Sequence, residues 1–181
     1  MNKIVLKHLF SAVVLLLAVI TGQAQTVDVF IFDNDGQFTN VRNSPSGRIV
    51  DRIPVDASAT LAIERPTNGW WRVVGNRYTA MTNDPDSESD FKVYRLRGSS
   101  NGYWIHNSVI AVGTRNYGGQ HLKLRAEPNT SSRVTYTIKE EQVVRPIDIR
   151  GRWVKVKTLD GRGIGWIDAE WLCGNPLTNC N

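Results

Sequence analysis

The sequence is poor in the residues that most often carry chemistry. Its 181 residues include two cysteines, three histidines and two methionines. No group of His, Cys, Asp and Glu has the spacing of a metal site, so we expect neither a metal centre nor a cofactor. Runs of five or more Lys and Arg are also missing, so the net charge of +5 does not indicate a nucleic-acid partner.

Long hydrophobic stretches are absent except at the N-terminus. There the basic residues Lys3 and Lys7, an apolar run over Leu9–Ile20 and small residues after it are typical of a secretory signal peptide. The run is too short for a spanning helix of about 20 residues. We therefore expect cleavage of residues 1–24 and an exported protein, periplasmic or secreted, without a membrane span. Because no Cys follows Ala24 directly, a lipid anchor is not expected.

The two cysteines, Cys173 and Cys180, lie close together near the C-terminus. An even number of cysteines in an exported chain, separated here by Gly, Asn and Pro, predicts a disulfide that closes a tail loop. The spacing differs from the Cys-x-x-Cys of redox proteins.

The chain contains an internal repeat. Residues 35–45 align with residues 118–128 at an offset of 83, with Gly, Gln, Arg and Pro in common, and Trp70 aligns with Trp153 at the same offset. Trp104 aligns with Trp166 at an offset of only 62. The first copy must therefore contain an insertion, which we place at about residues 79–98, including an acidic run.

Short segments rich in β-branched and aromatic residues, bounded by Gly, Pro, Asn, Asp and Ser, recur along the chain. A helical period of 3.6 residues is not seen beyond the N-terminal run. We predict an all-β protein of two modules, residues 25–108 and residues 109–181, each a small β-barrel.

Alternation along one hairpin predicts which side chains leave the core. A type I′ turn at Asp160-Gly161 pairs Val154 with Ile167 and places both on the core face. Trp153, Lys155 and Trp166 then lie on the opposite face of the hairpin. The repeat predicts an equivalent face in the first module. The predicted ligand-binding residues are Trp70, Arg72, Tyr103, Trp104, Trp153, Lys155 and Trp166.

Three blocks in each copy resemble the bacterial SH3 (SH3b) family. They are Phe38–Ser46, Asn68–Val73 and Gly102–Ile105 in the first copy, and Leu122–Pro128, Trp153–Val156 and Gly165–Ile167 in the second. The first copy departs from the family pattern by its insertion and by a Thr in place of an aliphatic residue at position 39. The resemblance implies two tandem SH3-like barrels that are exported and bind peptides or peptidoglycan.

These observations predict an exported binding protein that recognises a peptide or a cell-wall glycopeptide. Tryptophan offers a broad, rigid face to Pro or sugar rings, and Arg72 and Lys155 are suited to a carboxylate. Two alternatives remain: the tryptophans pack in the cores or between the modules, or the modules dock on a periplasmic protein as an inhibitor, immunity-type or assembly factor. An enzyme is not expected, because a disulfide leaves no thiol for a Cys–His nucleophile.

Overall fold

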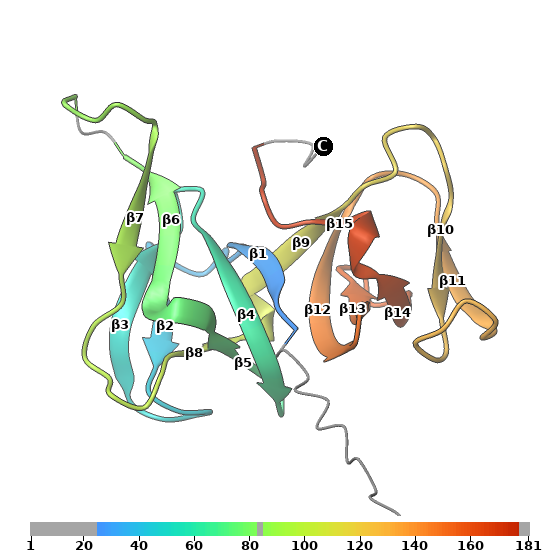
Figure 1. The fold of residues 1–181 in the computed structure, drawn as a ribbon, viewed down its shortest axis with the longest axis horizontal. Helices are drawn as coiled ribbons and strands as arrows, with labels where there is room; N and C mark the ends of the chain where they lie inside the picture. The colour runs from blue at the N-terminus through green and yellow to red at the C-terminus, as the bar shows by residue number, and fades with distance from the viewer. Residues whose placement is uncertain (1–24, 83–84, 178–181) are drawn as a thin grey trace, which may run out of the picture.

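The computed structural model describes residues 25–82 and 85–177, so the predicted signal peptide and Cys180 lie outside the described residues. Within them the chain forms fifteen β-strands and three single-turn 3-10 helices (Figure 1). The prediction of an all-β protein is confirmed. None of the helices in the described ranges is long and apolar enough to cross a membrane.

The strands are short and fall into two halves, which lie side by side in Figure 1. The first half contains β1 (Val27–Ile31), β2 (Phe38–Arg42), β3 (Ile49–Pro54), β4 (Thr60–Thr67), β5 (Trp70–Val73), η1 (Val74–Asn76), β6 (Arg77–Met81), β7 (Phe91–Arg95), β8 (Trp104–His106) and η2 (Asn107–Val109). The second half contains β9 (Ile110–Thr114), β10 (Leu122–Arg125), β11 (Val134–Ile138), β12 (Val143–Arg150), β13 (Trp153–Thr158), β14 (Ile164–Asp168), η3 (Ala169–Trp171) and β15 (Leu172–Cys173).

Strand pairing follows the same plan in both halves. The order β1-β4-β5-β8-β2-β3 in the first half corresponds to β9-β12-β13-β14-β10-β11 in the second. Trp70 pairs with His106 across β5 and β8, and Trp153 pairs with Asp168 across β13 and β14. The two tryptophans therefore occupy equivalent strand positions, as the alignment requires.

Strand β9 joins the halves. It pairs with β1 of the first half and with β12 and β15 of the second, so one sheet runs through both. The indole N–H of Trp71 on β5 donates to the carbonyl of Pro146 on β12 at 3.3 Å. The guanidinium of Arg145 donates to the carbonyls of Asn107 and Ile110. The bonds to Pro146 and to Asn107 cross between the halves and fix them against each other.

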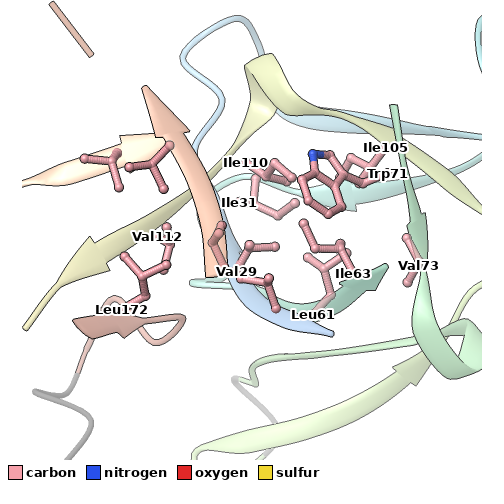
Figure 2. Packing of buried hydrophobic residues seen from close by; sticks show 14 of the residues in the cluster. Val29, Ile31, Leu61, Ile63, Trp71, Val73, Ile105, Ile110, Val112 and Leu172 are labelled. Atoms are coloured by element: carbon pink, nitrogen blue, oxygen red, sulfur yellow. The ribbon is translucent and has the colours of Figure 1, made fainter. Parts of the chain in front are cut away.

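Buried side chains of both halves form one hydrophobic cluster. Figure 2 shows Val29 of β1 between Trp71 and Ile63 on one side and Val112 and Leu172 on the other. Trp71, Val29, Ile63 and Val112 are fully buried. The core is therefore continuous across the join at β9.

The predicted register of the hairpin β13–β14 is confirmed, but its turn is different. Val154 lies opposite Ile167, and both are buried. A type I′ turn needs a positive φ at both central residues, and Asp160 does not have one, whereas Gly161 has φ 75°. Thr158 N–H instead bonds the carbonyl of Gly163, which closes a four-residue loop. The register is unchanged because this longer loop is centred on the same two residues.

Hydrogen bonds inside this loop lower the pKa of Asp160 to about 2. The hydroxyl of Thr158 donates to the carboxylate at 2.6 Å, and the backbone N–H and side chain of Arg162 donate to it as well. A depressed pKa means that this contribution to stability is complete above the ordinary value of 3.8 and is lost as the pH falls through about 2. We expect Thr158→Ala to raise the pKa of Asp160, measured by an NMR titration of its carboxyl carbon. An unchanged pKa would show that the hydroxyl is not the main cause.

The insertion predicted at about residues 79–98 coincides with a second hairpin. Its strands β6 and β7 pair from Arg77 opposite Arg95 to Met81 opposite Phe91. Only Thr79 of β6 is paired with β4, through Thr60, so the hairpin projects from the first half (Figure 1).

Cys173 is buried at the end of β15 and is not a free cysteine. Its predicted partner, Cys180, lies outside the described residues. The tail disulfide therefore stays a prediction.

Candidate functional site

Four of the six tryptophans lie outside the hydrophobic core cluster, as the alternation of the strands predicts. They are Trp70 and Trp104 in the first half and Trp153 and Trp166 in the second. Trp71, next to Trp70 on β5, is fully buried. The two halves therefore each carry a pair of tryptophans on the face that points away from the core.

In the first half, Trp70 is enclosed by its own neighbours. The guanidinium of Arg42 lies 5.5 Å from the centre of its ring, and the ring of His106 lies edge-on at 4.9 Å. Arg42 is held there because it also donates to the carbonyl of Gly47 at 2.6 Å. Burial and the charge of Arg145 lower the pKa of His106, which favours a neutral ring beside Trp70.

Arg72 lies opposite Trp104 on the same face. Its guanidinium is 3.5 Å from the carboxylate of Glu64, whose side chain is only 12% exposed. A ligand carboxylate would have to compete with this internal ion pair. The predicted role of Arg72 is therefore weakened by a neighbour that the sequence does not place beside it.

Two of the predicted ligand-binding residues are buried, and for these the expectation of an exposed side chain is wrong. Tyr103 is 3% exposed, because the alternation that turns Trp104 outward turns its neighbour inward. Its hydroxyl donates to the carbonyl of Ser99. Trp166 is 2% exposed although it lies outside the core cluster.

Trp166 is covered by cations from neighbouring strands. Arg150 of β12 lies 5.1 Å from its ring centre, and the ammonium of Lys155 on β13 lies 5.9 Å away. These contacts stabilise the ring and shield it from solvent. Lys155 therefore packs on Trp166 rather than pointing to an open binding surface.

Trp153 is different, because it lines a cleft of about 250 Å³ beside the second half's 3-10 turn. Trp171 of η3 forms another wall, and both rings are partly exposed. An adjoining cavity of about 390 Å³ shares three of the lining residues and adds Arg115 and Tyr117. We call the two together the Trp153–Trp171 cleft; its other lining residues are Gln120, His121, Leu122, Lys123, Arg125, Thr130, Ile167, Asp168 and Glu170.

The acidic side chains that line this cleft have partners, whereas some of the other polar side chains do not. The two carboxylates, Asp168 and Glu170, both pair with Arg152, at 2.5 Å and 3.2 Å. Asp168 also accepts the N–H of Glu170 and so caps the turn. The side chains of Lys123 and His121 have no hydrogen-bond or ion-pair partner among the described residues, so the cleft offers donors to an anionic group.

Sequence reasoning missed Trp171 and Tyr117. Trp171 has no tryptophan counterpart, because Val109 stands at the equivalent place after β8. The repeat of tryptophans between the two halves therefore does not indicate Trp171. The sequence contains six tryptophans, and the predicted core and ligand faces account for only five of them. The unassigned sixth residue is Trp171.

Comparisons with known proteins identify part of the chain. A family model described as "Bacterial SH3 domain" matches residues 121–172. This range contains β10 to η3 and most of the Trp153–Trp171 cleft. The second half thus contains one bacterial SH3 domain. No curated protein matches the chain.

Two solved structures from Trichomonas vaginalis resemble the chain weakly. The structure of NlpC1 is 12% identical with a TM-score of 0.30, and it aligns over 89% of this chain and 50% of its own. The structure of NlpC2 is also 12% identical with a TM-score of 0.29, over 83% of this chain and 48% of its own. The chain spans about half the length of both.

Proposed function

We propose that this chain is an exported, non-catalytic binding protein that recognises a peptide or a cell-wall glycopeptide through the Trp153–Trp171 cleft. The observation that carries the proposal is the cleft itself, in which two partly exposed indole rings stand beside Lys123, whose ammonium group has no partner among the described residues. The matching bacterial SH3 domain, a module typical of cell-wall and peptide binding, supports the ligand class. The second tandem copy in residues 25–108 and the signal peptide are parts of the same proposal.

The cleft suits a ligand with one flat apolar or sugar face and one carboxylate. Trp153 and Trp171 would stack on the flat face, while their ring N–H groups orient polar atoms of the ligand. Lys123 would pair with the carboxylate as a mobile point charge, and Arg125, held by a 2.8 Å bond to Ser132, would contribute a fixed one. A muropeptide, in which a peptidoglycan sugar carries a stem peptide with free carboxylates, combines these features.

The second candidate is a module that docks on a periplasmic protein as an inhibitor, immunity-type or assembly factor. It is favoured by the exposed apolar side chains of the first half, which include Met81, Phe91 and Val93 at 37–58% exposure. Such a partner would contact the hairpin β6–β7 rather than the cleft of the second half.

We expect Trp153→Ala to lose about 2 kcal/mol or more of binding free energy for purified peptidoglycan, as anchoring aromatic residues commonly do. The matched control is Trp70→Ala, which removes the equivalent residue of the first half. Sedimentation of each protein with insoluble peptidoglycan measures the bound fraction.

The control variant should bind like the unmodified protein. Loss of binding in Trp70→Ala, with Trp153→Ala unaffected, would move the site to the first half. An unmodified protein that does not sediment with peptidoglycan, but is retained on immobilised periplasmic extract, would favour the protein-docking function instead.

A further inference from the structure

The first half contains a cavity of about 450 Å³ that plays no part in the proposed function. Residues of β1, β4, η1 and β6 line it, together with the chain that follows β15. Two of its lining residues are charged, Asp28 on β1 and Arg77 on β6, and we call it the Asp28–Arg77 cavity after them. It shares no residue with the Trp153–Trp171 cleft.

Strand pairing sets the two charged residues on either side of a small one. Asp28 lies opposite Ala62 of β4. At the other edge of β4, Thr60 pairs with Thr79 of β6, and two residues further along the two strands stand Ala62 and Arg77. Neighbouring strands are about 4.8 Å apart, so the backbones of Asp28 and Arg77 are roughly 10 Å apart. Ala62 leaves the space between them open.

Glycines allow the two charged side chains to lie against opposite walls. The guanidinium of Arg77 lies over Gly75 of η1, since its Nε would be 3.0 Å from a Cβ at that position. On the other side, Gly174 is so close to Asp28 that an added Cβ would overlap the Asp28 backbone. Figure 1 shows the chain after β15 turning back from the second half toward β1. The cavity is therefore bounded by a cation at η1 and by an anion at the tail.

Neither charged group is neutralised by the protein. Asp28 and Arg77 are both exposed, and their side chains have no ion-pair or hydrogen-bond partner among the described residues. Arg77 also lies directly opposite Arg95 of β7, an unfavourable pairing of like charges on neighbouring strands. A carboxylate at Arg77 would relieve this repulsion, and an ammonium group would pair with Asp28.

We propose that the Asp28–Arg77 cavity binds a zwitterion of dipeptide size, with its ammonium group on Asp28 and its carboxylate on Arg77. Contacts of about 2.8 Å at both ends of a span of roughly 10 Å leave about 4 Å between the charges of the ligand. In a single amino acid only one carbon atom separates the two groups, whereas the ends of a dipeptide are far enough apart.

Polar groups between the two charges suit the peptide bond of such a ligand. Thr60 and Thr79 stand side by side in the lining and offer hydroxyl groups. The side-chain oxygen of Asn175 accepts the N–H of Leu177 at 2.9 Å, which leaves its amide N–H groups as donors. The site does not depend on the Trp153–Trp171 cleft.

Titration of the ¹⁵N-labelled protein with alanyl-alanine tests the site, with the backbone N–H signals of Gly75 and Gly174 as reporters. We expect saturable shifts of both signals with a dissociation constant of about 1 mM, because exposed ion pairs are weak. N-acetyl-alanyl-alanine lacks the ammonium group, alanyl-alanine amide lacks the carboxylate, and alanine is too short. Each of the three should bind at least about tenfold more weakly.

Variants assign the two charges to the two ends of the ligand. Asp28→Asn and Arg77→Gln should each weaken the binding of alanyl-alanine at least about tenfold. Asp28→Asn should also bind alanyl-alanine and its N-acetyl form equally, because the partner of the ammonium group is gone. The matched controls are Asp56→Asn and Arg48→Gln, exposed residues outside the cavity, which should bind like the unmodified protein.

Three results would overturn the proposal. They are the absence of saturable shifts at Gly75 and Gly174, equal binding of alanyl-alanine and its two blocked forms, and shifts confined to the indole signals of Trp153 and Trp171. The last result would place the dipeptide in the cleft of the second half. Failure of the cleft to bind peptidoglycan would leave the signals of Gly75 and Gly174 unaffected, so the two proposals fail separately.

Discussion

Replacing Trp71 by Ala is expected to lower the free energy of unfolding by about 3–5 kcal/mol, the range for removing a fully buried aromatic side chain. Trp71 is 0% exposed and lies in the core that both halves share (Figure 2). The substitution also removes the hydrogen bond from its indole to the carbonyl of Pro146. A buried carbonyl without a partner adds to the cost.

The control for this variant is Trp70→Ala at the neighbouring position. Trp70 is partly exposed and held by Arg42 and His106, so its removal should cost roughly 1 kcal/mol, the strength of such surface ring contacts. Urea unfolding of both variants measures the difference. Equal destabilisation would contradict the assignment of the two rings to opposite faces.

Gly165→Ala is expected to destabilise the protein by about 1–3 kcal/mol through overpacking. A Cβ at Gly165 would come within 2.8 Å of the carbonyl oxygen and 2.9 Å of the nitrogen of Arg125, which belong to the β10 backbone. Backbone atoms in a paired strand cannot move aside as a flexible side chain can. Strand β10, which carries Lys123 and Arg125 of the cleft, would have to shift away from β14.

The matched control is Gly113→Ala in strand β9. There an added Cβ would meet one carbonyl oxygen, that of Cys173, at an ordinary 3.5 Å. Since glycine costs roughly 0.5–1 kcal/mol relative to alanine inside a strand, this variant should be neutral or slightly stabilised. Melting temperatures of the two variants compare them directly, and a lower value for Gly113→Ala than for Gly165→Ala would refute the steric argument.

Local alternation was enough to predict which tryptophans face the core. The period of two residues in a strand separates Trp70 from Trp71 and Trp153 from Val154 without any knowledge of the fold. The same rule places Tyr103 inward, so its assignment to the ligand face neglected information that the sequence contained. The repeat likewise aligned the two halves correctly at β5 and β13.

What covers the outer face could not be predicted, because the covering side chains come from distant strands. Arg150 and Trp166 meet only when β12, β13 and β14 lie side by side, and Arg42 meets Trp70 across β8. The cleft at Trp153 depends in turn on a short turn after β14 that brings Trp171 beside it. Periodicity within one strand carries no information on such contacts.

The central claim is that the Trp153–Trp171 cleft is the ligand site, and the indole N–H signals of the six tryptophans test it most directly. A soluble muramyl peptide is titrated into ¹⁵N-labelled protein, with the signals assigned by single substitutions. Saturable shifts of the Trp153 and Trp171 signals, with the Trp71 signal unmoved in its bond to Pro146, are the predicted result. Shifts confined to Trp70 and Trp104, or no shift in any of the six signals, would contradict it.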